Sequence, residues 1–128
     1  MTEVTAKLYN YRQSPRKVRL VADAVRGKSV ANALDVLSFI PKRAALPIQK
    51  LVASALANAK AKEMATDTLI VKELTVDAGA TLYRRRPRSK GMANPIRKRT
   101  SHVVITLGEG KPKFNKARAN KAKGKKTA

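Results

Sequence analysis

The chain has 128 residues, no cysteine and a formal net charge of +21. This length predicts one small domain, and the missing cysteines exclude a disulfide framework and a cysteine-based zinc site. The sign and size of the charge exclude an acidic interaction tail and point to RNA, DNA or an anionic membrane surface as the partner.

No apolar run approaches the roughly 18 residues that a membrane-spanning helix needs. The N-terminal sequence has neither the basic region nor the apolar region of a signal peptide. Cysteine-free composition fits a reducing compartment, so we expect a cytoplasmic protein.

The positive charge is concentrated in the last third of the chain. Residues 1–78 carry 13 Lys or Arg against 7 Asp or Glu, which is ordinary for a basic domain. Residues 79–107 carry 8 against none, and residues 108–128 carry 8 against 1. These two segments therefore predict where an anionic partner binds.

The first half of the chain predicts one strand and three helices. Residues 3–11 alternate apolar and polar side chains, which favours a half-buried strand. Ser14-Pro15 begins a helix that runs to about Arg26 and ends at Gly27. Ser29 begins a second helix that closes near Phe39.

A third helical pattern covers about residues 42–62, with Pro47 inside it. Because proline breaks a helix interior but is tolerated in the first turn, we expect either a kink or a later start. The second half of this segment is rich in alanine, which favours helix and permits close packing.

Residues 69–77 and 102–107 are short, β-branched and apolar, and predict two strands. The 24 residues between them form a segment too long for a structureless loop in a compact domain unless that loop is functional. We expect one continuous hairpin over residues 78–101, with a turn at Lys90-Gly91 and with Pro87 and Pro95 blocking ladder bonds on its arms. Arms of about ten residues would reach about 30 Å from the body.

Residues 108–128 combine glycine, alanine and basic side chains, and nothing in them can form a core. We expect a single domain over residues 1–107, with the hairpin part of it, followed by a flexible basic tail.

The residues expected to contact nucleic acid are basic side chains in three places, because arginine bonds phosphate through a planar fork and stacks on bases. Tyr83 is expected either to stack on a base or to cover the apolar body. The hairpin supplies Tyr83, Arg84, Arg85, Arg86, Arg88, Lys90, Arg97, Lys98 and Arg99; the first helix supplies Arg16, Lys17 and Arg19; and the tail supplies Lys111, Lys113, Lys116 and Arg118.

Nothing in the sequence predicts an enzyme, a cofactor or a metal site. His102 is the only histidine, and the acidic residues are scattered without the paired spacing of general acid–base catalysis. Ser14, Ser29 and Ser38 fall at expected helix ends, and no glycine-rich phosphate loop is present.

Five strings in one order carry a resemblance to a known family. They are residues 14–23 (SPRKVRLVAD), residues 53–59 (ASALANA), Val76-Asp77, residues 87–91 (PRSKG) and residues 98–102 (KRTSH). The chain resembles the bacterial-type large-subunit ribosomal protein number twenty-two over about residues 4–107.

The resemblance implies an α+β fold, with three helices packed on a small, mainly antiparallel three-stranded sheet and a long protruding β-hairpin. It also implies a non-catalytic protein that binds and organises large-subunit rRNA beside neighbouring ribosomal proteins. The hairpin tip, Arg88, Ser89, Lys90, Gly91 and Met92, would face the nascent polypeptide in the exit tunnel. No membrane partner and no homo-oligomer are expected.

The alternative is an architectural DNA-binding protein whose basic β-arm uses Pro87 or Pro95 to wedge open base steps. The chain has no spare apolar face for the dimerisation typical of such proteins. A cationic membrane-active protein is a third class, but no helix pairs a wholly basic face with a bulky apolar one.

Overall fold

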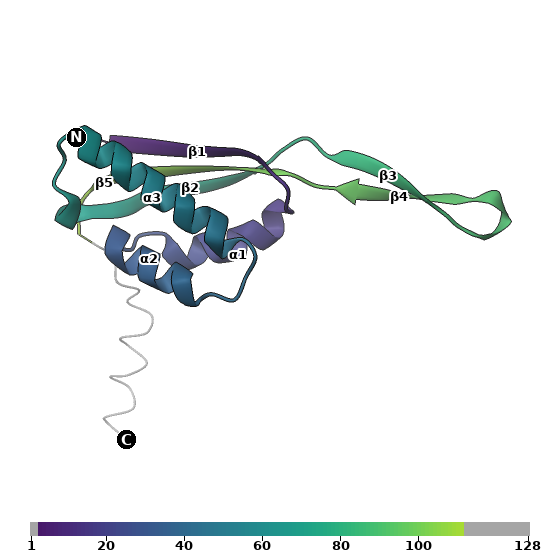
Figure 1. Ribbon diagram of the computed structural model, residues 1–128, viewed down its shortest axis with the longest axis horizontal. Helices are drawn as coiled ribbons and strands as arrows, with labels where there is room; N and C mark the ends of the chain where they lie inside the picture. The colour runs from purple at the N-terminus through teal and green to yellow at the C-terminus, as the bar shows by residue number, and fades with distance from the viewer. Residues whose placement is uncertain (1–2, 112–128) are drawn as a thin grey trace, which may run out of the picture.

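The computed structural model describes residues 3–111. The elements are β1 (Glu3–Tyr11), α1 (Pro15–Val25), α2 (Val30–Phe39), α3 (Ala45–Ala61), β2 (Leu69–Ala78), β3 (Leu82–Pro87), β4 (Ala93–Lys98) and β5 (Ser101–Glu109). Strands β1, β5 and β2 form an antiparallel sheet in that order, while β3 and β4 form a separate two-stranded ribbon. The ribbon projects from one end of the body (Figure 1). The expected α+β fold is confirmed.

Local signals placed the first two helices correctly. Ser14 and Ser29 occupy the N-cap positions of α1 and α2 in extended conformation, although neither hydroxyl makes a capping hydrogen bond. Gly27 has a φ of 74°, the left-handed conformation that ends the segment after α1.

The third helix begins at Ala45, three residues later than the hydrophobic pattern suggested. Pro47 therefore lies in its first turn, where the missing N–H has no carbonyl to bond within the helix. The later start, rather than a kink, accommodates the proline.

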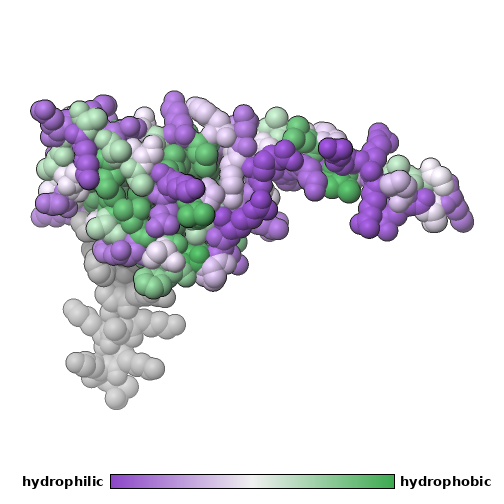
Figure 2. All heavy atoms as spheres, viewed as in Figure 1, coloured by the Kyte–Doolittle hydropathy of each residue, from purple (hydrophilic) through white to green (hydrophobic). Residues whose placement is uncertain are grey.

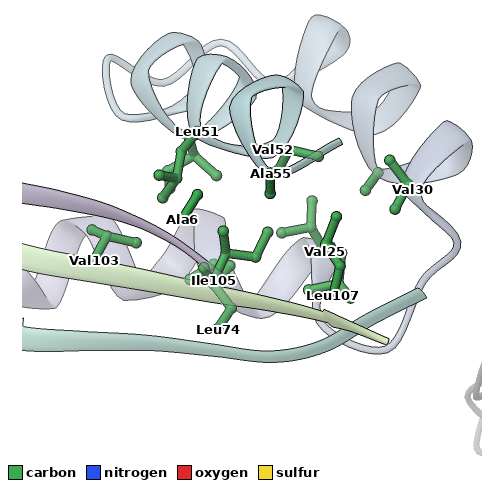
Figure 3. Packing of buried hydrophobic residues seen from close by; sticks show 14 of the residues in the cluster. Ala6, Val25, Val30, Leu51, Val52, Ala55, Leu74, Val103, Ile105 and Leu107 are labelled. Atoms are coloured by element: carbon green, nitrogen blue, oxygen red, sulfur yellow. The ribbon is translucent and has the colours of Figure 1, made fainter. Parts of the chain in front are cut away.

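The hydrophobic core lies between the three helices and one face of the sheet. Along β5, buried and half-buried residues alternate from Ser101 to Leu107, so only one face is covered by the helices. Figure 3 shows Val52 and Ala55 of α3 above Ala6 of β1 and Ile105 of β5. The sheet contributes Val4, Ala6, Leu69, Val71, Leu74, Val76, Val103, Ile105 and Leu107 to this core.

Two arginine side chains, one from α1 and one from its C-cap position, cover the outer edge of β2. Arg19 donates from Nε and Nη2 to the carbonyl oxygen of Val76, at 3.2 and 3.0 Å. Arg26 donates to the carbonyl oxygen of Leu74 at 2.8 Å and also pairs with Asp23. These bonds satisfy carbonyl groups that an edge strand would otherwise expose to another chain.

The outer edge of β1 is covered from α3 in the same way. Asn58 donates from Nδ2 to the Thr5 carbonyl oxygen at 3.2 Å, and Lys62 reaches the Glu3 carbonyl oxygen at 3.5 Å. Because α3 and α1 each bond one edge strand, the sheet is closed to strand addition at several positions on both sides.

The expected continuous hairpin is two ladders with a break between them. The β2–β5 ladder ends at the pair Ala78 and Ser101, and the β3–β4 ladder begins at the pair Leu82 and Lys98. Three residues on one arm oppose two on the other, and this unequal count requires an irregular joint. The expected hairpin over residues 78–101 is therefore present, but its ladder is interrupted at residues 79–81 rather than at the prolines.

The joint is held by residues 79–80 and Thr100. Gly79 N–H donates to the Thr100 carbonyl oxygen at 2.9 Å, and the Thr100 hydroxyl donates to the Ala80 carbonyl oxygen at 2.6 Å. A Cβ on Gly79 would lie 2.4 Å from Thr100 Oγ1, so only glycine fits this close approach.

Both ends of β5 differ slightly from expectation. Strand β5 runs from Ser101 to Glu109 rather than over residues 102–107, because Gly108 and Glu109 still pair with Glu3 and Leu69. Most of the expected tail, residues 112–128, lies outside the described residues. Within residues 3–111, no helix is long and apolar enough to cross a membrane.

Candidate nucleic-acid interface

The β3–β4 ribbon has almost nothing to bury. Every side chain in β3 is exposed, and in β4 only Ile96 is half-buried. The space-filling view shows hydrophilic side chains along most of its length (Figure 2). An isolated two-stranded ribbon is marginally stable in water, so a binding partner along both faces would stabilise it.

The strand register divides the basic run between the two faces of the ribbon. Because side chains alternate along a strand, Arg84 and Arg86 lie on one face and Arg85 on the other. We name the first the arginine face and the second the tyrosine face. The arginine face carries Leu82, Arg84, Arg86, Arg88, Asn94, Ile96 and Lys98, and the tyrosine face carries Tyr83, Arg85, Pro87, Ala93, Pro95 and Arg97.

No basic residue of the ladder faces another directly. Arg84 lies opposite Ile96, Arg85 opposite Pro95, and Arg86 opposite Asn94. Directly opposed like charges destabilise a strand pair, and a slip by two residues would oppose Arg85 and Arg97. The observed register therefore avoids direct repulsion across the strands between the basic residues of the ladder.

Contrary to expectation, Pro87 and Pro95 do not interrupt this ladder. Pro87 pairs with Ala93 at the end of β3, and Pro95 pairs with Arg85 inside β4. In a two-stranded ribbon each strand is an edge strand, so an imide nitrogen facing outward removes no ladder bond.

The expected turn is confirmed at Lys90-Gly91. Met92 N–H donates to the Ser89 carbonyl oxygen at 3.3 Å, and Lys90 and Gly91 have φ values of 59° and 67°. Positive φ at both central residues defines the type I′ turn, whose twist matches that of antiparallel strands. Arg88 N–H donates to the Met92 carbonyl oxygen at 2.7 Å and closes the loop, so residues 88–92 form an ordered, exposed tip.

The three candidate residues of α1 have different surroundings. Arg16 and Lys17 are exposed in the first turn, beside backbone N–H groups that attract anions. Arg19 is committed to the Val76 carbonyl oxygen, so part of its hydrogen-bonding capacity serves the fold. This contact was not predictable from local sequence patterns because Val76 is 57 residues away from Arg19.

Residues 6–108 match a family model described as ribosomal protein L22p/L17e. The match covers most of the chain and includes α1, the whole ribbon and all of the core except Val4. The chain belongs to the L22p/L17e family. The resemblance carried by the five sequence strings is confirmed.

Individual relatives agree with this family. A large ribosomal subunit protein uL22 of Deinococcus radiodurans is 57% identical over 99 residues, which cover 77% of this chain and 74% of the relative. The protein of the same name from Desulfitobacterium hafniense is 54% identical over 101 residues, covering 78% and 89%. That of Lactobacillus helveticus is 48% identical over 110 residues, covering 85% and 94%.

These comparisons favour one of the alternatives left open by the sequence. The relatives are named as ribosomal proteins, and the architectural DNA-binding interpretation receives no support from them. Within residues 3–111 of this L22p/L17e member, no three His, Cys, Asp or Glu side chains gather as metal ligands would.

The remaining candidates lie at the C-terminal end. Lys111 is exposed just beyond β5, whereas Lys113, Lys116 and Arg118 lie outside the described residues.

The structure also brings together two aromatic residues that the sequence did not connect, Tyr9 and His102, whose ring centroids are 5.3 Å apart. The alternation of β1 could have placed Tyr9 on the open face, but only the strand order shows its neighbour.

Proposed function

We propose that the chain is a non-catalytic structural protein of the large ribosomal subunit that binds and organises rRNA. The β3–β4 ribbon inserts between rRNA segments, and its tip, residues 88–92, faces the nascent-peptide exit tunnel. The observation that carries this proposal is an exposed ribbon with no core of its own, in a segment, residues 79–107, that has eight basic residues and no acidic one.

Charge on both faces suits a ribbon surrounded by RNA rather than one lying on an RNA surface. The arginine face can bond the phosphates of one strand segment while Arg85 and Arg97 bond those of another. Neutralising phosphates releases counterions, which favours binding and removes the self-repulsion of the protein. The expected contribution of Arg16, Lys17 and the basic tail is of the same kind.

The salt dependence of rRNA binding tests the ribbon directly. If each of the eight basic residues neutralises one phosphate, the ribbon alone contributes about −6 to the slope of log K against log salt. We expect Arg84→Gln with Arg86→Gln, and separately Arg85→Gln with Arg97→Gln, each to reduce that slope by about 1.5. The full chain is titrated against large-subunit and small-subunit rRNA transcripts.

The matched control removes two charges from the exposed side of α3, by Lys50→Gln with Lys60→Gln. An equal fall in slope for this control would show that binding is not directed by the ribbon. Tighter binding to duplex DNA than to large-subunit rRNA would refute the proposal and restore the architectural alternative.

The tunnel position of the tip is tested separately, and the cysteine-free sequence makes the experiment clean. A Met92→Cys variant incorporated into ribosomes is expected to cross-link to a stalled nascent chain through a short thiol reagent. Ser38→Cys, exposed on α2 in the body, serves as the control and should give no such product. Cross-linking of Met92→Cys to rRNA alone would contradict the tunnel assignment while leaving rRNA binding intact.

A further inference from the structure

One face of the three-stranded sheet is not covered by the helices among the described residues. Its side chains are mostly small or polar, and the basic and acidic ones are mixed rather than predominantly basic. The strand register assigns to this face Thr5, Lys7 and Tyr9 of β1, His102, Val104 and Thr106 of β5, and Glu73, Thr75 and Asp77 of β2.

Two aromatic rings stand at the end of this face nearest the ribbon. Tyr9 is 58% exposed, and its ring meets that of half-buried His102 at an interplanar angle of 75°. His102 lies one residue beyond the Ala78–Ser101 pair that closes the sheet. The aromatic pair is therefore directly beside the joint from which the basic ribbon begins.

The His102 ring is held in a defined orientation. Asn10 N–H donates to His102 Nδ1 at 3.1 Å, so in the neutral ring the proton is on Nε2. On its other side the ring packs against Gly79, where an added Cβ would be 3.1 Å from Cε1 and Nε2. Within residues 3–111, Nε2 makes no hydrogen bond, so its N–H is available to a ligand.

The backbone that supplies the Asn10 N–H has a left-handed conformation inside a β-bulge. The β1–β5 register shifts between Leu8 and Tyr11, and Asn10 has a φ of 54°, which is uncommon for a residue other than glycine. A bulge of this kind often re-aims a side chain beside a functional site. Here it directs one N–H at His102 and leaves the neighbouring Tyr9 ring projecting from the face.

We propose that Tyr9 and His102 form a binding site for one unpaired base of the rRNA, with the base stacked on Tyr9 and the Nε2–H of His102 donating to it. Single-stranded bases in RNA are recognised by stacking on aromatic side chains together with hydrogen bonds to their edges. The proposal rests on the proposed rRNA-binding function and adds a base-reading site on the sheet to the basic ribbon.

The local charges favour a base over a phosphate. Asp77 lies directly opposite His102 in the β2–β5 register and is exposed on the same face. Its carboxylate would repel a phosphate but accept N–H groups from the edge of a base. The Asp77 carboxylate as acceptor and the His102 Nε2–H as donor, beside the exposed Tyr9 ring, therefore suit a nucleobase. The basic ribbon instead suits the phosphates of the RNA backbone.

The test compares full-length variants in binding to the large-subunit rRNA transcript. Tyr9→Ala is expected to weaken binding about tenfold, the usual effect of losing one stacked base, and Tyr9→Phe to retain binding within about twofold. The salt slope of Tyr9→Ala should equal that of the wild type because no phosphate contact is lost. Chemical probing should show one unpaired nucleotide that wild type and Tyr9→Phe protect and Tyr9→Ala does not.

Phe39→Ala is the matched control, since Phe39 is an 85% exposed aromatic residue on α2 in the helix layer. It is expected to bind rRNA as the wild type does. Equal weakening by Phe39→Ala, or wild-type affinity of a folded Tyr9→Ala, would overturn the base-binding site. If Tyr9→Ala binds naked rRNA normally but does not assemble with the other subunit proteins, the base-binding site is wrong. Tyr9 would then contact a neighbouring protein instead of a base.

The two proposals fail in different ways. If the wild type does not prefer large-subunit rRNA, the proposed function itself is wrong. If the wild type shows that preference and Tyr9→Ala leaves affinity and probing unchanged, only the aromatic site is wrong.

Discussion

Replacing Arg19 by methionine tests whether this arginine stabilises the fold or binds nucleic acid. The substitution keeps most of the aliphatic stem but removes both N–H groups that bond the Val76 carbonyl oxygen, at 3.2 and 3.0 Å. Hydrogen bonds to a charged group contribute about 1.5–3 kcal/mol each when well shielded. Water can reach this partly exposed edge and replace them in part, so we expect a loss of about 1–2 kcal/mol in the free energy of unfolding.

For a domain of this size, that loss lowers the melting temperature by about 5–10 °C. Thermal unfolding followed by circular dichroism measures the change. Arg16→Met is the control, because Arg16 is exposed on the same helix and makes no hydrogen bond within residues 3–111. Its stability should stay within about 0.5 kcal/mol of the wild type.

The same two variants are then compared in rRNA binding. Arg16→Met is expected to lower the salt slope by about one, and a folded Arg19→Met to change it less. Equal melting temperatures for the two variants would show that the Arg19 contact with β2 does not stabilise the fold, and the reasoning would be refuted.

Two further substitutions test the joint and the buried start of β5. Gly79→Ala is expected to destabilise the protein by about 1–3 kcal/mol in urea unfolding, because its Cβ would lie 2.4 Å from Thr100 Oγ1; unchanged stability would mean that the joint adjusts freely. Ser101→Ala is expected to raise stability by about 1 kcal/mol in the same assay, since the buried Ser101 hydroxyl has no hydrogen-bond partner among the described residues. A loss of stability in Ser101→Ala would instead indicate that a bound water satisfies the hydroxyl.

The helices of this chain were predictable because their signals are local. A serine at the N-cap, proline in the first turn, a stripe of apolar residues and a closing glycine all lie within one helix length of α1. The start of α3 was less certain because alanine-rich sequence is compatible with helix on both sides of Pro47. The structure decides between the kink and the later start, because a helix that begins at Ala45 places Pro47 in its first turn.

The ribbon was predictable as a hairpin but not as a separate ladder. Glycine at the turn and the length of the basic segment indicated a protruding arm. The break at residues 79–81 depends on Thr100, which reaches the chain 20 residues earlier, at Ala80. Contacts of that separation leave no periodic pattern in the sequence, because they are set by the close approach of two backbones rather than by side-chain spacing.

The sequence by itself determined the charge, the element types and the basic segment that points to nucleic acid. These follow from composition and from periodicities of a few residues, which act before the chain is compact. Tertiary structure alone decided which basic residues share a face, which arginine serves the sheet edge, and which residue neighbours Tyr9. Each of these depends on strand register or on helix placement, and a shift of one residue in a strand would move every side chain to the other face.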